Sequence, residues 1–299
     1  MISSADWKSV IADTNRPLLN RVSNGTYPPG SIYKMVVGVE LIEKNLVNTE
    51  WSVFCSGEYE FYDRTFRCWD DNGHGKINLE QAIVQSCDVY FYQAIQNIDI
   101  DDLAKRSLEF LHGLPTGIDL PAEMKGRVPT RQFMNKLYGR YGWSKGAMLN
   151  LSIGQGELLV TPLQMLAYTN LFATQGKTYP LHLVNKPTKM SQSPEISDRT
   201  WKLIQKYMEL SITQAKGTGR RSDPDIPGLI IGGKTGTAEN PHGEPHAWFI
   251  AFGKKDDKMI SITIMIENGG SGGEVAAPIA KKVFQYYFGP KLNNLTQES

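Results

Sequence analysis

The last third of the chain carries the pattern that restricts the fold most strongly. Three short runs, at residues 229–231, 248–252 and 260–266, are rich in β-branched and aromatic side chains, which favour strands. The second and third runs are joined by a tight polar turn at residues 253–257, so they should pair as an antiparallel hairpin. An apolar helix is predicted to follow at residues 276–288. These features predict an antiparallel sheet flanked by helices.

The preceding part of the chain is mainly helical. Apolar residues from Ile32 to Ile42 recur with the period of a buried helix face. The helix-breaking segment Pro28-Pro29-Gly30 precedes this helix, and Asn45 is predicted to end it. Further helices are predicted at residues 79–95, 101–111, 161–174 and 197–213. Gly113 is the expected C-cap of the second of these helices and Thr161 the expected N-cap of the third. Residues 55–75 are predicted to form a long ordered loop. We therefore expect one domain of the α/β (α+β) class over residues 1–299, with an α/β lobe at about 1–50 and 150–299 and a mainly helical lobe at about 51–149.

Charge and hydropathy narrow the classes of function. Lys and Arg together number 32 and Asp and Glu 31, so the net charge near zero gives no basic footprint for nucleic acid. No apolar run reaches the roughly 18 residues of a membrane-spanning helix, and the polar start lacks the apolar stretch of a signal peptide. The chain is therefore either cytosolic or a fragment whose anchor and targeting segment lie upstream.

Two residues at the start of the first buried helix could carry acyl-transfer chemistry. Ser31 and Lys34 lie three positions apart and share one helix face. A serine hydroxyl needs a base within hydrogen-bond reach, and a lysine can serve if burial or nearby cations lower its pKa. Taken alone, the pair is explained more simply as an N-cap serine and a surface lysine.

Two further motifs contain hydroxyls and charged groups. The segment Lys234-Thr235-Gly236-Thr237 follows the predicted strand at residues 229–231. Lysine and hydroxyls along an exposed strand can hold a carboxylate, and Gly236 leaves room for a substrate beside the backbone. A strand-end turn with a solvated lysine is the competing explanation. The third motif, Ser86-Cys87-Asp88, places a hydroxyl and a carboxylate in the helical middle, where helix capping would also account for them.

Together the three motifs resemble the Ser-x-x-Lys, Ser-x-Asn/Asp and Lys-Thr-Gly set of penicillin-binding proteins and serine β-lactamases. Other segments are similar to the elongation-type class B enzymes (penicillin-binding protein 2 type). These segments are Asn20-Arg21, Tyr27-Pro28-Pro29-Gly30-Ser31, Gly73-His74-Gly75, Ser86-Cys87-Asp88-Val89-Tyr90-Phe91-Tyr92, Thr116-Gly117-Ile118-Asp119-Leu120-Pro121, Ile153-Gly154-Gln155-Gly156, Asn240-Pro241-His242-Gly243 and His246-Ala247-Trp248-Phe249. The resemblance implies the transpeptidase fold, in which a five-stranded antiparallel sheet is flanked by helices and joined to a helical subdomain.

The resemblance also implies a mechanism for peptidoglycan cross-linking, with β-lactams as inhibitors. Ser31 would attack the carbonyl between two D-alanines of a stem pentapeptide, Lys34 would take its proton, and Ser86 would relay a proton towards the leaving amine. Asp88 belongs to the same catalytic set, and aspartate at this position is frequent in elongation-type enzymes. No catalytic cofactor is expected.

The Lys-Thr-Gly strand is implied to bind the substrate. Backbone N–H groups of Ser31 and Thr237 would form the oxyanion hole. The hydroxyls of Thr235 and Thr237, helped by Lys234 and with room left by Gly236, would hold the terminal carboxylate.

Relatives of this type have strands ahead of the Pro-Pro-Gly-Ser segment, a pedestal domain and a membrane anchor, whereas only about 30 residues precede Ser31 here. We therefore expect the anchor and the pedestal to be absent from this chain. The resemblance implies an extracytoplasmic location at the periplasmic face of the inner membrane. It also implies that a polymerase of the elongation machinery and its scaffold are partners, bound through the missing N-terminal region.

The cysteines fit a second kind of site. Cys55, Cys68 and Cys87 are the three cysteines of the chain, and His74 lies between the last two. Three thiolates and one imidazole make a tetrahedral zinc set, and the position resembles a zinc site of some elongation-type relatives. We expect a structural zinc ion that pins residues 55–75 against the helix carrying Ser86. A Cys55–Cys68 disulfide, with Cys87 free and His74 in a structural hydrogen bond, is the alternative.

Three other functions compete with transpeptidation. A class A β-lactamase would need a deacylating glutamate in a Glu-x-x-Leu-Asn segment, and the sequence has no such string. A D,D-carboxypeptidase would pass the same acyl group to water. A penicillin-sensing domain would be acylated without turnover. His242 and His246 are interpreted as polar loop residues near the rim of the cleft.

Overall fold

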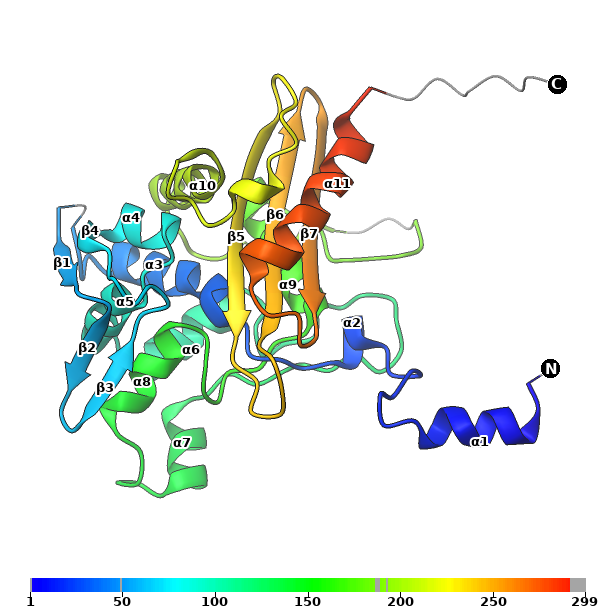
Figure 1. The fold of residues 1–299 in the computed structure, drawn as a ribbon, viewed down its shortest axis with the longest axis horizontal. Coiled ribbons are helices and arrows are strands. Elements are labelled where there is room, and N and C mark those ends of the chain that lie inside the picture. The colour runs from blue at the N-terminus through cyan, green and yellow to red at the C-terminus, as the bar shows by residue number, and fades with distance from the viewer. Residues whose placement is uncertain (1, 49, 186–188, 192, 291–299) are drawn as a thin grey trace.

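The fold is taken from a computed structural model, which describes residues 2–48, 50–185, 189–191 and 193–290. In these residues the main sheet is antiparallel, with strand order β5-β6-β7 formed by Ile230–Ala238, His246–Lys255 and Lys258–Ile266. Helix α11 (Ala277–Phe288) covers one face of this sheet and α9 (Pro162–Thr174) lies behind it (Figure 1). The predicted hairpin and its closing helix are confirmed, with the turn shortened to Asp256 and Asp257.

The main sheet is narrower than the resemblance implied. Within the described residues it has three strands rather than five, and β7 has no neighbour on its outer side. The segment before Ser31 forms the helices α1 (Ser4–Ala12) and α2 (Arg21–Asn24) instead of edge strands. Ser3 starts α1 because its side chain accepts a hydrogen bond from the backbone N–H of Asp6, and α1 buries none of its residues. Helix α1 therefore extends away from the sheet (Figure 1).

The helical lobe is built around α3 (Lys34–Glu43), which is preceded by the 3₁₀ turn η1 (Gly30–Tyr33). The predicted stripe is confirmed, and Asn45 adopts the left-handed backbone, with φ 52°, that ends the helix. The elements packed around α3 include α4 (Leu79–Val84), α5 (Asp88–Ala94), α6 (Ile100–Glu109) and α10 (Asp198–Thr213). None of the helices in the described part of the chain combines the length and apolar character that crossing a membrane requires.

Helix caps fall where the sequence places them. Thr161 and Gln164 form a reciprocal capping box at the start of α9, with Pro162 in the first turn. Ser197 caps α10 by accepting from the backbone N–H of Thr200. The predicted C-cap at Gly113 is an exception: α6 ends at Glu109 with Phe110 as its C-cap, and Leu111 adopts the left-handed backbone with φ 66°. The remaining helical segments are η2 (Ile95–Asn97), α7 (Arg131–Tyr138), α8 (Lys145–Ser152), η3 (Arg220–Ser222) and the π-helical η4 (Gly272–Ala276).

Two predictions for the helical lobe are wrong. The single helix at residues 79–95 is two helices, α4 and α5, because Ser86 adopts a left-handed backbone with φ 58° that interrupts them. The predicted loop at residues 55–75 contains two short antiparallel ladders. One pairs β1 (Ser52–Cys55) with β4 (Gly75–Asn78), and the other pairs β2 (Glu58–Phe61) with β3 (Arg64–Arg67).

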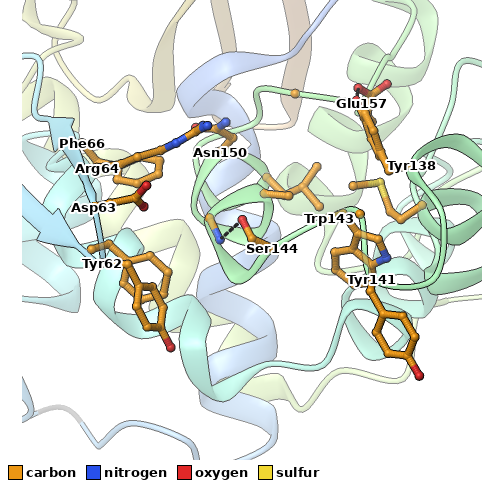
Figure 2. Close-up of a pocket in the computed structure, with 17 residues that line it drawn as sticks. Tyr62, Asp63, Arg64, Phe66, Tyr138, Tyr141, Trp143, Ser144, Asn150 and Glu157 are labelled. Atoms are coloured by element: carbon orange, nitrogen blue, oxygen red, sulfur yellow. Dashed lines mark hydrogen bonds between the residues drawn. The ribbon is translucent and has the colours of Figure 1, made fainter.

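A groove opens beside the second of these ladders. It lies between the β2–β3 hairpin and the segment that contains α7 and α8, and its cavity volume is about 660 Å³ (Figure 2). Its lining includes Gly156 and Glu157 of the segment that follows α8. The groove is therefore lined mainly by the helical lobe and is closed on one side by residues 150–157.

Candidate active site

Ser31 lies at a point where three chain segments meet. Its neighbour Gly30 has φ 59° and donates its backbone N–H to the carbonyl oxygen of Gly154 at 2.9 Å. A β-carbon on Gly30 would lie 2.6 Å from the carbonyl oxygen of Thr237, so only glycine allows η1 to approach β5 this closely. The start of α3 is thereby fixed between the loop at Gly154 and the Lys-Thr-Gly strand.

Lys34 points into the protein rather than to solvent. Its ammonium is fully buried and donates to Asp88 Oδ1 at 2.7 Å, to the carbonyl oxygen of Ser86 at 2.8 Å and to Ser86 Oγ at 3.3 Å. The left-handed backbone of Ser86 presents both of these oxygens to the same amine. A surface lysine is thus excluded for this position.

Lys234 reaches the same hydroxyl from the sheet. Its Nζ donates to Ser86 Oγ at 2.8 Å and to the carbonyl oxygen of Thr235 at 3.1 Å, and it is fully buried. Burial and the neighbouring charge of Lys34 lower the pKa of Lys234 well below its usual range, and Asp88 opposes this only in part. The solvated lysine of the competing explanation is excluded here as well.

Asp88 connects these amines to the segment that contains Cys68 and Trp69. Its Oδ2 accepts the backbone N–H of Trp69 at 2.9 Å, and its own backbone N–H points to Cys68 Sγ at 3.4 Å. The carboxylate stands in the first turn of α5, where a helix favours negative charge. Burial raises the pKa of Asp88, and the charge of Lys34 opposes the shift.

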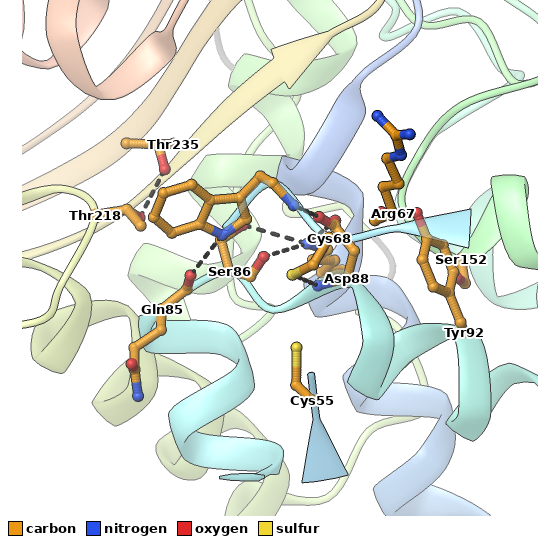
Figure 3. Close-up of polar contacts among 12 residues, drawn as sticks. Cys55, Arg67, Cys68, Gln85, Ser86, Asp88, Tyr92, Ser152, Thr218 and Thr235 are labelled. Atoms are coloured by element: carbon orange, nitrogen blue, oxygen red, sulfur yellow. Dashed lines mark hydrogen bonds and ion pairs between the residues drawn. The ribbon is translucent and has the colours of Figure 1, made fainter. Parts of the chain in front are cut away.

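The Lys-Thr-Gly strand places its side chains in different surroundings. The Thr235 hydroxyl lies 2.7 Å from that of Thr218, and the two face each other in Figure 3. Thr237 is exposed, and its hydroxyl accepts the backbone N–H of Gly272 at 3.4 Å. A β-carbon on Gly236 would meet Ile32 and the Pro29 carbonyl oxygen at 3.0 Å. Our sequence interpretation gave that space to the substrate, whereas the geometry gives it to the turn that carries Ser31.

Two residues of this cluster were missed in the sequence. Thr218 binds the Thr235 hydroxyl, and its backbone N–H donates to the Val84 carbonyl oxygen at 3.3 Å. The glycines on both sides of it, in Lys216-Gly217-Thr218-Gly219, are the signal that could have found it. Trp69 was missed because an exposed tryptophan next to a cysteine belongs to no recognisable sequence motif. Its Nε1 donates to the Gln85 carbonyl oxygen at 3.0 Å.

The predicted metal ligands come together beside Asp88. The sulfurs of Cys55, Cys68 and Cys87 and a nitrogen of His74 all lie within 4.8 Å of one another. His74 Nδ1 lies 3.5 Å from the sulfur of Cys55 and 3.6 Å from that of Cys68. The three cysteines are free and buried, so the alternative with a Cys55–Cys68 disulfide is wrong. This cluster could hold a metal ion.

Comparisons with known proteins identify the family of the chain. A family model of the penicillin binding protein transpeptidase domain matches residues 3–285, and the chain belongs to that family. Within it, the chain is of the PBP2/MrdA type. It is 33% identical to the peptidoglycan D,D-transpeptidase MrdA of Haemophilus influenzae over 97% of this chain and 49% of that protein.

Solved structures show the same likeness. PBP2 of Pseudomonas aeruginosa, in complex with WCK 5153, matches with a TM-score of 0.86 and 32% identity over 95% of this chain and 64% of that one. PBP2 of Helicobacter pylori, in its complex with MreC, matches with a TM-score of 0.84 and 34% identity over 96% of this chain and 55% of that one. The chain spans about half the length of the curated relatives it matches.

Proposed function

We propose that the protein is a peptidoglycan D,D-transpeptidase that cross-links stem peptides in cell elongation through an acyl-enzyme on Ser31. One observation carries the proposal. Two buried ammonium groups, Lys34 from a helix and Lys234 from a strand, converge on the single hydroxyl of Ser86 next to the turn that holds Ser31. The fold does not require this arrangement, but the arrangement supplies a route for protons between a nucleophile and a leaving group.

During acylation, protons move along this route. Ser31 Oγ bonds to the carbonyl carbon of the penultimate D-alanine, and its proton passes to Lys34. The bond to the terminal D-alanine then breaks, and the departing amine receives a proton through Ser86 Oγ, which lies within reach of both lysines. An amine of a neighbouring stem peptide attacks the acyl-enzyme, and the same groups carry its proton away.

The resting charges support this sequence of steps. Asp88 is the carboxylate partner of Lys34, at 2.7 Å. Burial lowers the pKa of Lys234, so this amine gives up a proton more readily than an exposed lysine does. A proton that moves from Lys34 through Ser86 to Lys234 leaves Lys34 free to act as the base.

Substrate binding is assigned to the neighbouring strand. The hydroxyls of Thr235 and Thr237, assisted by Lys234, hold the terminal carboxylate of the donor. Thr218 fixes the Thr235 hydroxyl for this task. The backbone N–H groups of Ser31 and Thr237 form the oxyanion hole, and the close approach of Gly30 to Thr237 supports that pairing.

We further propose that the cysteine cluster holds a structural zinc ion. With zinc bonds of about 2.3 Å to sulfur and about 2.05 Å to nitrogen, a tetrahedron separates sulfur from nitrogen by about 3.6 Å. The measured separations from His74 Nδ1 to Cys55 and Cys68 are 3.5 and 3.6 Å, so the donor set fits the ion. The ion would hold the ligands of residues 55–74 against the segment that carries Ser86, and it takes no part in the reaction.

The wider setting is also a proposal. We assign the chain to an extracytoplasmic place at the periplasmic face of the inner membrane, and its partners to a polymerase of the elongation machinery and a scaffold. The likeness to a PBP2 that was solved with MreC supports a scaffold partner. Residues 1–299 act as one transpeptidase domain with the two lobes given above, and the rest of the machinery contacts it through an N-terminal anchor and pedestal.

A fluorescent penicillin tests the nucleophile. We expect a covalent adduct that peptide mass spectrometry locates on Ser31, and the Ser31→Ala variant should lose it while its thermal unfolding midpoint stays the same. An adduct retained in that variant would contradict the assignment. Release of the acyl group to water instead of an added acceptor amine would favour a D,D-carboxypeptidase, and a stable adduct without turnover of peptide donors would favour a penicillin sensor.

A further inference from the structure

The groove beside the β2–β3 hairpin has no role in the steps above. Seventeen residues line it, and the six aromatic ones are Phe61, Tyr62, Phe66, Tyr138, Tyr141 and Trp143. Tyr62 is 84% exposed and Tyr141 is 89% exposed, so neither ring is needed for the core. In Figure 2 the two tyrosines stand on opposite sides of the opening. Large exposed rings at the rim of a cavity are typical of a binding site rather than of a structural surface.

Polar groups in the groove are available for a ligand. Arg64 and Asn150 make no ion pair or side-chain hydrogen bond with another described residue. Figure 2 shows the guanidinium of Arg64 extending towards Asn150. Glu157 is instead occupied, because it accepts from Tyr138 and pairs with Arg127 at 3.1 Å. The groove thus offers aromatic faces with a few free hydrogen-bond donors.

Both walls of the groove lead to the candidate active site. On one side, β3 (Arg64–Arg67) is followed directly by Cys68 and by Trp69, whose backbone N–H donates to Asp88 Oδ2. On the other side, the segment containing Gly156 passes through Gly154, which accepts the backbone N–H of Gly30. With about 3.8 Å between successive Cα atoms, that path places Gly156 within about 18 Å of Ser31.

We propose that this groove holds the sugar chain to which the stem peptide is attached, an inference that rests on the proposed transpeptidase function. A pentapeptide spans at most about 17 Å when extended, and the four residues up to the cleaved bond span about 14 Å. The upper bound of about 18 Å at Gly156 is close to the length of an extended stem peptide, so a sugar chain at this end of the groove is placed to present its own stem peptide to Ser31. The pyranose rings stack their C–H faces on the tyrosines, and their hydroxyl and acetamido oxygens accept from Arg64 and Asn150.

The charge of the groove favours a sugar over the peptide itself. A stem peptide carries several carboxylates, which would require a surplus of cations. The groove provides Arg64 but also the carboxylates of Asp63 and Glu157. A neutral chain of N-acetylated amino sugars matches this balance, whereas an anionic peptide does not.

The experiment compares two donors that share one pentapeptide, either free or attached to a tetrasaccharide of the cell-wall glycan. The variant replaces both exposed rings, as Tyr62→Ala with Tyr141→Ala, and the control is Tyr286→Ala, a 93% exposed tyrosine on α11. We expect the double variant to lose about tenfold in kcat/KM for the glycan-linked donor, since each aromatic contact contributes about threefold. Its kcat/KM for the free pentapeptide and its rate of acylation by penicillin should match those of the wild type and the control.

Two results would overturn the inference. Equal use of the glycan-linked donor by the double variant and the wild type would show that the groove does not hold the sugar. An equal loss for both donors would assign the groove to the peptide. If the wild type is not acylated at all, the proposed function fails separately, and a calorimetric titration with the peptide-free tetrasaccharide then decides the groove: binding that the double variant loses supports it, and absence of binding refutes it.

Discussion

Replacing Lys34 by methionine would test how the candidate active site is held together. The ammonium of Lys34 is fully buried, and its 2.7 Å bond to Asp88 is the only ion pair of that carboxylate among the described residues. Methionine has a similar length and no charge, so it fills the space without replacing the pair. Asp88 would keep one hydrogen bond to its carboxylate, from the backbone N–H of Trp69.

The expected loss follows from the burial of the pair. Removing one member of a buried ion pair lowers the free energy of unfolding by about 3–5 kcal/mol, because the other charge stays in the interior without compensation. Burial already raises the pKa of Asp88, and loss of Lys34 raises it further. A carboxyl group with a raised folded-state pKa contributes stability at acid pH and loses it as the pH rises through that pKa. The variant should therefore be least destabilised near about pH 3, where the carboxyl group is largely neutral in both states.

Urea unfolding of four proteins measures this effect: the wild type, Lys34→Met, Asp88→Asn and the double variant. At about pH 8 we expect Lys34→Met to lose about 3–5 kcal/mol and the double variant to recover more than about 1 kcal/mol of that loss. A coupling energy below about 0.5 kcal/mol between the two positions would refute the reasoning, because it would mean that the pair contributes to stability as two independent residues.

Two other expectations concern the amine on the strand and the metal ligands. The pKa of Lys234 is lower in the folded protein than in the unfolded chain, so the unfolded chain binds more protons. The free energy of unfolding of the wild type should therefore increase as the pH rises from about 7 to about 10, by at most about 1.4 kcal/mol per pH unit. Lys234→Gln should lack this gain, and parallel stability curves for the two proteins would count against it. A chelator should lower the unfolding midpoint and release about one zinc ion per chain by elemental analysis. An unchanged midpoint with no zinc found would leave the cluster as three thiols and an imidazole.

The sequence predicts best those features that depend on neighbours along the chain. Thr161 and Ser197 start helices where their side chains cap the following backbone, and Asn45 ends one where a left-handed residue is needed. The motif spacing likewise predicts that Ser31 and Lys34 lie about one turn apart, and the structure places them in two consecutive elements, the 3₁₀ turn η1 and the helix α3. The contact between Lys234 and Ser86 could not be predicted from local patterns, because these two residues lie 148 positions apart in the sequence.

The features that the sequence missed depend on contacts between distant segments. Residues 79–95 carry apolar side chains on both sides of Ser86 and no Gly or Pro between them, so nothing in the sequence marks the left-handed residue that divides the two helices. The pairing of β2 with β3 escaped because charged and aromatic side chains on an exposed hairpin resemble an ordered loop. The space beside Gly236 was assigned to the substrate because a sequence alone cannot show that Ile32 fills that space. In each case a neighbour in space decides what the residue does.

The cysteine cluster and the candidate catalytic residues belong to one structural unit. Cys87 stands between Ser86 and Asp88, and Cys68 Sγ faces the backbone N–H of Asp88 while the next residue, Trp69, binds its carboxylate. A left-handed backbone at a non-glycine residue costs about 1–2 kcal/mol, which must be offset by the surroundings of Ser86. Binding of a structural zinc ion contributes about 10–16 kcal/mol in small zinc domains, far more than this cost. On the proposed zinc site, the ion therefore has enough binding energy to hold Ser86 in the conformation that presents its hydroxyl to both lysines.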